Sequence, residues 1–128
     1  MNIVDMLTVR FNRWRPTMEK IIREQGDYTS VDDIYNRCME LKLLYFDTPG
    51  AFAVIDVIEE TKVTRLHIQL AGGSLEALFK LEQIVAKFGV SIGATKMTFV
   101  GRKGFTRALS KFGWCAPVVY MEKEIPNG

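Results

Sequence analysis

Residues 64–74 read Thr-Arg-Leu-His-Ile-Gln-Leu-Ala-Gly-Gly-Ser, and this stretch decides the fold. Apolar residues stand at every second position from Leu66 to Leu70, which predicts a strand with one apolar and one polar face. After the two glycines the apolar spacing becomes that of a helix, with Ser74 as its N-cap. Because a further strand is predicted at 96–100, residues 64–100 form a βαβ unit.

The flanking segments extend this unit into a single domain, residues 1–128, of the α/β (α+β) class. Its N-terminal part, residues 1–27, is predicted to be a helical arm or a first helix, and residues 124–128 a tail. The segment 52–58 is almost continuously apolar, which is typical of a strand buried on both faces. Helices are predicted at 16–25, 30–40, 74–88 and 103–112, and strands at 43–46, 52–58, 64–70, 96–100 and 117–123.

Two of these helices have a clear predicted core face and end. The helix at 30–40 should bury Val31, Ile34, Cys38 and Leu41. The helix from Ser74 should end at Gly89. Its predicted buried residues are Leu78, Leu81, Val85 and Phe88.

Composition narrows the class of protein. Hydrophobic residues make up 48% of the 128, enough for one packed core. The net charge of +2 does not favour a nucleic-acid partner. One His and two separated Cys exclude the usual zinc motifs, so no metal site is expected. No apolar run is long enough to span a bilayer and no signal peptide is visible, so a cytoplasmic, reduced protein is expected.

The glycine-containing turn is the main candidate for a binding site. Glycines at a strand-to-helix turn let backbone N–H groups approach a ligand, and the helix N-terminus adds a positive dipole end. Together these features are typical of a phosphate or pyrophosphate site. The alternative is that Gly72 and Gly73 only form a tight turn.

The order of elements and this turn resemble the GNAT superfamily of acyl-CoA N-acetyltransferases. Members carry Gln or Arg, two residues, Gly, one residue, and Gly or Ala; here Gln69 and Gly72 match, and Ser74 departs in the last position. The resemblance implies a central mixed, mostly antiparallel sheet of about five strands flanked by about four helices. It also implies acetyl-CoA as cofactor, with an amine as acceptor. The implied binding residues are Gln69, Leu70, Ala71, Gly72, Gly73 and Ser74.

The second half of the chain is similar to small GNAT-like proteins of tailed phages and prophages. The similarity lies in five segments: 68–73, 86–89, 101–109, 112–114 and 120–124. It implies a phage-encoded protein in the host cytoplasm or the virion. A phage or host protein is then a candidate partner, and a homo-oligomer remains open.

Catalytic candidates are few. His67 is the candidate base because its ordinary pKa suits proton transfer near neutral pH, with Glu59 and Glu60 as rivals and a purely structural role as the alternative. The family's usual acid is a Tyr, and the resemblance places Leu109 in that position. Tyr120 is the candidate substitute, with a structural tyrosine as the alternative. Nothing near Cys115 predicts an activated thiol.

Two groups of basic residues complete the candidates. The helix at 103–112 carries Lys103, Arg107 and Lys111 on one face, and Arg102 adds charge at its entry. This group could hold the 3′-phosphate of CoA, contact nucleic acid, or form a solvated face. The second group consists of three arginines, Arg10, Arg13 and Arg15, around the aromatic residues Phe11 and Trp14. Such a group could bind nucleic acid or protein. The alternative is that its aromatic rings pack inward.

Two functions therefore follow from the sequence. The first is an acetyl-CoA-dependent N-acyltransferase whose acceptor amine the sequence does not specify. The second is a catalytically inactive GNAT-like phage protein that serves as a virion component or a host-interaction module.

Overall fold

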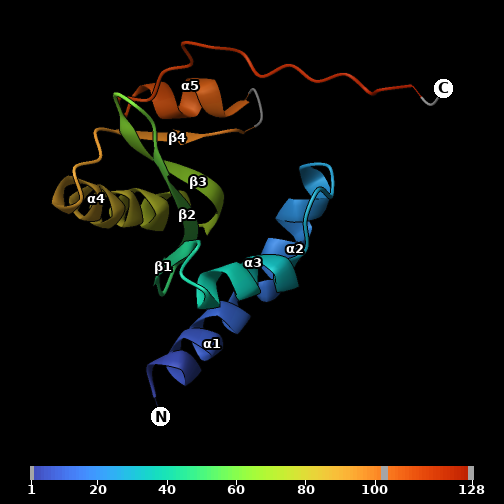
Figure 1. Cartoon of the computed structure of the whole chain (residues 1–128), viewed down its shortest axis with the longest axis vertical. Helices are drawn as coiled ribbons and strands as arrows, with labels where there is room; N and C mark the ends of the chain where they lie inside the picture. The colour runs from blue at the N-terminus through green and yellow to red at the C-terminus, as the bar shows by residue number, and fades with distance from the viewer. Residues whose placement is uncertain (1, 102–103, 127–128) are drawn as a thin grey trace.

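The computed structural model of the chain describes residues 2–101 and 104–126 (Figure 1). Strands β1, β2 and β3 form an antiparallel meander, and β4 lies parallel to β3 at the end of the sheet. The predicted mixed sheet and its βαβ unit are confirmed, with four strands among the described residues where about five were expected. The elements are α1 (Ile3–Arg13), α2 (Arg15–Glu24), α3 (Val31–Met39), β1 (Leu44–Thr48), β2 (Ala51–Glu59), β3 (Thr64–Gly73), α4 (Leu75–Ser91), β4 (Lys96–Phe99) and α5 (Gly104–Ser110).

The sheet separates two hydrophobic cores. Helices α1–α3 cover one face and α4 covers the other (Figure 1). Strand β2 serves both, since Phe52 and Val54 pack with α1–α3 while Ala53 and Ile55 pack with α4. The prediction that this strand is buried on both faces is confirmed.

Strand β3 contains a bulge at Gln69. Val54 pairs with Leu70 and Ile55 with Ile68, so Gln69 has no partner on β2. An extra residue reverses the alternation of side chains beyond it. Leu66 therefore packs in the α4 core and Leu70 in the α1–α3 core. The prediction that the apolar residues from Leu66 to Leu70 share one face is wrong.

The helix starts agree with their predicted caps, whereas one predicted helix end is wrong. Ser74 Oγ accepts a hydrogen bond from Ala77 N at 3.2 Å, which confirms it as the N-cap of α4. Gly89 does not end this helix, which continues to Ser91. A Cβ at Gly89 would lie 2.9 Å from Leu66 Cδ1, so this glycine permits close packing of α4 on β3.

Helix α3 also ends earlier than its apolar pattern predicts. Val31, Ile34 and Cys38 are buried as expected, but Leu41 is 77% exposed. Leu41 lies beyond the helix with a φ of 60°, and the chain turns there so that Leu43 enters the core instead.

The predicted last strand is absent from the structure. Residues 115–126 form no helix or strand and run away from the sheet (Figure 1), and Tyr28 donates to Glu122 Oε2 of this segment at 2.7 Å. The segment begins after Trp114, whose Nε1 donates to Glu82 Oε1 at 2.6 Å and whose ring packs edge-on against Phe99. Trp114 thus fixes the end of the folded domain to α4 and β4.

Candidate functional site

The junction of β3 and α4 is built by two glycines that the packing requires. Gly73 has a φ of +128°, and a Cβ there would lie 2.6 Å from Ala51 Cα and against Gly50 O. A Cβ at Gly72 would lie 2.9 Å from Phe52 Cε1 and 3.0 Å from Ile21 Cδ1, in the α1–α3 core. Close packing therefore explains why glycine stands at both positions, and at Gly72 the packed side is the α1–α3 core.

The backbone amides at this junction point in two directions. Ser74 N donates to Gly50 O at 3.1 Å, and residues 71–73 pair with β2. In an antiparallel ladder successive N–H groups alternate between the two edges of a strand. The amide of Gly72 therefore faces β2, like that of Ser74. The amides of Ala71 and Gly73 face the opposite edge, toward the side of β4.

Among the described residues, that edge of β3 has no strand partner beyond its middle. Strand β4 pairs with β3 only from Arg65↔Lys96 to Ile68↔Phe99, whereas β3 continues to Gly73. No described strand pairs with this edge over the last five residues of β3, and this unpaired stretch is called the gap below. The N-terminus of α4 begins at the far end of this edge.

A small apolar cavity lies between the sheet and α4. Its volume is about 50 Å³, and Glu82 is its one charged lining residue among those described. The Glu82 carboxylate is already hydrogen-bonded to Trp114. The cavity is lined by Ala53, Ile55, Ile68, Ala71, Leu78, Leu81, Glu82, Val85 and Met97.

A polar network surrounds His67 on the other face of the sheet. His67 Nδ1 lies 2.8 Å from Thr98 Oγ1, which also accepts from Arg65 Nη1 at 2.9 Å. Arg65 donates in turn to Glu60 Oε1 at 2.7 Å. Since Nδ1 is engaged, Nε2 is the ring nitrogen left for a substrate.

His67 is held in its neutral form. Burial lowers the pKa of His67, and the positive charge of Arg65 lowers it further, while Asp56 opposes both. Gln69 Nε2 contacts Asp56 Oδ2 at 3.5 Å, at the same end of the network. A half-buried neutral imidazole on a central strand can accept a proton at pH 7.

The structure links Glu60 to the network of His67 through Arg65, whereas Tyr120 lies on a different part of the chain. Tyr120 lies on the extended segment and is 64% exposed. Glu59 ends β2 at the surface, and Glu60 is engaged by Arg65. Leu109 is half-buried on α5. Among the described residues, the hydrogen-bond partner of His67 is Thr98 and not a tyrosine.

The basic candidates do not form one site. Arg107 and Lys111 are exposed, and Arg102 and Lys103 lie outside the described residues. In the other group, Phe11 is fully buried, as the inward-packing alternative predicts.

Ion pairs hold two of the arginines beside Phe11. Arg10 Nε donates to Asp47 Oδ1 at 2.9 Å, and Arg15 Nη1 lies 2.8 Å from Asp32 Oδ1. The hydrogen bond and charge of Asp47 raise the pKa of Arg10. This group therefore fixes α1 and α2 to the rest of the domain.

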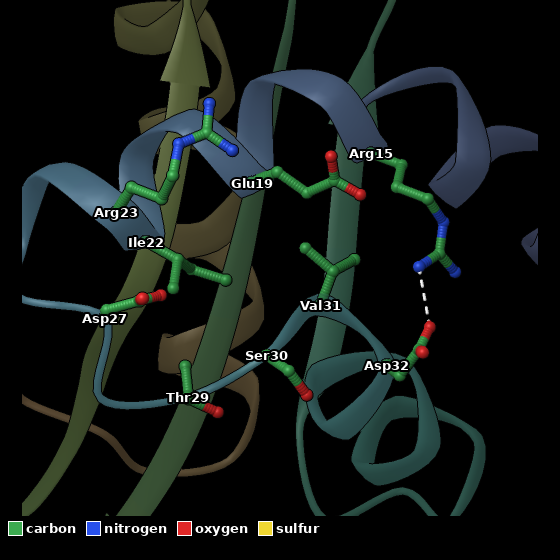
Figure 2. A pocket seen from close by; sticks show the side chains of 9 residues that line it. All are labelled: Arg15, Glu19, Ile22, Arg23, Asp27, Thr29, Ser30, Val31 and Asp32. Carbon is green, nitrogen blue, oxygen red and sulfur yellow. Dashed lines mark hydrogen bonds and ion pairs between the residues drawn. The ribbon is translucent and has the colours of Figure 1, made fainter.

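A larger open groove lies elsewhere, between α2 and the start of α3 (Figure 2). Its volume is about 320 Å³. Thr17 and Ile21 are the α2 residues nearest Gly72 of β3, whereas Glu19 and Arg23 of α2 line the groove. The groove therefore lies on a different side of α2 from the β3–α4 junction. Sequence reasoning did not identify it, because its mixed acidic and basic lining forms no motif.

Among the residues that the structure describes, no group of His, Cys, Asp and Glu side chains could hold a metal ion. The same part of the chain contains no helix with the length and apolar character needed to cross a membrane. Burial raises the pKa of the Cys38 thiol to about 11.

Comparison with solved structures identifies the fold. The chain superposes on a protein described as a probable acetyltransferase with a TM-score of 0.65, at 9% identity over 92% of both chains. It also matches an acetyltransferase from Trypanosoma brucei (TM-score 0.58, 12% identity, 75% of this chain and 78% of that one). The chain has the GNAT acetyltransferase fold.

A third structure of this fold is glucosamine-6-phosphate N-acetyltransferase from Arabidopsis thaliana, with a TM-score of 0.56 and 12% identity over 74% of this chain and 79% of that chain. By sequence, no protein-family model and no curated protein matches the chain. The GNAT-like fold predicted from the order of elements is therefore confirmed by structure.

Proposed function

We propose that the protein is a GNAT-type N-acyltransferase that transfers an acetyl group from acetyl-CoA to an amine. The observation that carries the proposal is the gap bordered by β3 beyond Ile68, where β4 no longer pairs. The amides of Ala71 and Gly73 face this gap. In the family, the corresponding gap seats the pantetheine arm.

The start of α4 fits the anionic part of the same ligand. Ser74 N and Ala77 N are bonded within the protein, but the first-turn amides of Leu75 and Glu76 have no such bond among the described residues. Two free amides at a helix N-terminus suit a pyrophosphate. The proposed cradle is thus Ala71, Gly73, Leu75 and Glu76, a shift from the predicted run of residues 69–74.

His67 is the proposed base. Its imidazole would take a proton from the acceptor amine as the amine nitrogen attacks the thioester carbonyl and the C–S bond breaks. Free thiols have pKa values near 8.5, so a CoA thiolate leaves with little help from an acid. The presence of Leu109 at the family's tyrosine position is compatible with this reaction, at a lower rate.

A second candidate function is a catalytically inactive GNAT-like phage protein, acting in the host cytoplasm or the virion by binding another protein. The observation that favours it is the same Leu109, together with the exposure of Tyr120 on the extended segment. In that case the gap would be a feature of the fold that binds no ligand.

Replacement of Ser74 by Asp tests CoA binding at the helix start. Asp is as good an N-cap as Ser, so α4 keeps its stability, but the new carboxylate would repel a pyrophosphate. The matched control is Ser30→Asp, because Ser30 caps α3 in the same way and accepts from Asp33 N at 3.1 Å. We expect Ser74→Asp to weaken CoA binding at least about tenfold and Ser30→Asp to leave it unchanged.

The readouts are the shift of the unfolding temperature with CoA and the release of free thiol in the presence of amines. CoA at about 100 times its Kd should stabilise the fold by about 2.7 kcal/mol. If millimolar CoA does not shift the unfolding temperature of the unmodified protein, the proposed acyltransferase function is wrong and the inactive protein is favoured. If CoA binds but no amine releases thiol, the fold has kept the ligand and lost the reaction.

A further inference from the structure

The apolar cavity between the sheet and α4 is lined by two groups of residues that differ in burial. The deeper group consists of side chains that are at most 4% exposed: Ala53, Ile55, Leu81 and Val85. The outer group consists of half-buried residues: Ile68, Ala71, Leu78, Glu82 and Met97. The cavity therefore reaches from the α4 core toward the surface, on the side of these half-buried residues.

Two alanines explain why this space exists. Ala53 of β2 and Ala71 of β3 lie directly opposite each other in the sheet, and both belong to the core beneath α4. Alanine is depleted in strands, where β-branched and aromatic side chains pack better on the pleated surface. A valine at either position would place its methyl groups in the cavity. The pair thus leaves room that typical strand residues would fill.

The chemistry of the cavity favours an apolar occupant. Apart from Glu82 its lining residues are apolar, and the Glu82 carboxylate already accepts a hydrogen bond from Trp114 Nε1 at 2.6 Å. A buried water needs at least two polar partners, so a cavity of this kind stays dry. Empty apolar space costs stability because the lining atoms lose contacts. An alkyl group that entered the cavity would restore those contacts.

Ala71 connects the cavity with the gap. Its side chain lines the cavity, while its amide faces the unpaired edge of β3. Ile68, the last residue of β3 that pairs with β4, also lines the cavity. A thioester held along this edge would therefore have the cavity beside it, on the α4 face of the sheet.

We propose that the cavity binds the alkyl chain of an acyl group longer than acetyl, so that propionyl-CoA and butyryl-CoA serve as donors alongside acetyl-CoA. The inference rests on the proposed function, because it places a CoA thioester in the gap. The bonds that form and break stay the same. The amine nitrogen attacks the carbonyl carbon, the C–S bond breaks, and the amine proton passes to His67. Only the chain attached to the carbonyl differs.

The size of the cavity limits the length of the chain. One water-sized group needs about 10–15 Å³ of such space, and the cavity has a volume of about 50 Å³. It thus has room for about three or four groups of this size. The chain of a butyryl group fits within that limit, whereas the chain of an octanoyl group exceeds it. We therefore expect affinity to rise from acetyl-CoA to butyryl-CoA and to fall again for octanoyl-CoA.

Calorimetric titration with CoA and these thioesters gives the first test. Each buried methylene should strengthen binding about fourfold, so butyryl-CoA should bind about 10–15-fold more tightly than acetyl-CoA. Ala53→Val should remove this difference and leave the affinity for CoA unchanged, because Ala53 lies on β2, outside the proposed cradle. Val57→Ile is the matched control. It adds a methyl group to the same core outside the cavity and should preserve the difference.

Urea unfolding of the same variants gives a second readout that needs no CoA. The added methyl groups of Ala53→Val would occupy existing space, so the midpoint of unfolding should stay the same or rise. A large fall in the midpoint would show that the space is absent and would overturn the proposal. Leu78→Ala changes the cavity in the opposite direction. It should extend the cavity on its α4 side and favour hexanoyl-CoA over butyryl-CoA.

The possible results separate this proposal from the proposed function. If acetyl-CoA and butyryl-CoA bind equally well, or if Ala53→Val leaves their difference unchanged, the acyl-chain site is wrong while the acyltransferase function stands. If neither CoA nor any of the thioesters binds, both proposals fail.

Discussion

Replacement of Gly73 by Ala should be the most destabilising single-methyl change at the β3–α4 junction. Two costs add. Holding an L-residue at positive φ costs about 1–2 kcal/mol, and forcing a methyl into a packed position costs about 1–3 kcal/mol. Here the obstacle is backbone, Gly50 O and Ala51 Cα, which cannot rotate away. We therefore expect a loss of about 2–5 kcal/mol, a large part of the 5–15 kcal/mol that is typical of a domain.

Gly93→Ala is the matched control, because Gly93 has a φ of +81° but nothing lies within 4 Å of its would-be Cβ. It should lose only the backbone cost of about 1–2 kcal/mol. Urea unfolding followed by the fluorescence of Trp14, which packs against Phe52, gives both values. If the two variants lose the same free energy, the close contact of Gly73 with β2 adds no cost, and its positive φ alone accounts for the glycine.

Three further predictions concern the side chains of His67 and the cysteines. The pKa of His67 is lowered in the folded state, so its neutral form stabilises the fold above the unfolded pKa of about 6.5. This stability is lost as the pH falls through the lower folded pKa. His67→Gln should remove that part of the pH dependence of the free energy of unfolding. The rate of acetyl transfer should fall below the same folded pKa, and His67→Gln should reduce it strongly; a profile that His67→Gln leaves unchanged would exclude His67 as the base. A thiol reagent should label Cys115, which is exposed, and not Cys38, which is buried with a pKa of about 11. Rapid labelling of both cysteines in the native protein would contradict the burial of Cys38 in the α1–α3 core.

Local sequence signals predicted the elements of this fold well, because each depends on neighbouring residues. Ser30 and Ser74 are N-caps as expected, and the apolar spacing of α4 places Leu81 and Val85 in the core. The turn after Thr48 and the βαβ unit follow from the same kind of signal.

The failures all depend on contacts between distant parts of the chain. The bulge at Gln69 exists only through the pairing of β3 with β2, so alternation within β3 could not show it. Gly89 looks like a helix end but is a contact point for Leu66. The segment 117–123 has the residues of a strand, yet a strand requires a partner, and none of the described strands pairs with it.

The candidate site was predicted in part for the same reason. The glycines and the helix start mark the junction correctly, but which amides remain free is decided by Gly50 O and the Ser74 side chain. His67 could be selected as a base from residue type alone. Its bond to Thr98, from a strand 31 residues away in sequence, could not.

The bulge at Gln69 has a consequence for how two reactants could meet. Before it, β3 presents His67 on the face that bears the polar network; after it, the strand presents Ala71 to the cavity beneath α4. A donor lying along the later residues and an acceptor approaching the earlier ones would thus come from opposite sides of one strand. They would converge at its single irregular residue, without having to pass each other in a common entrance.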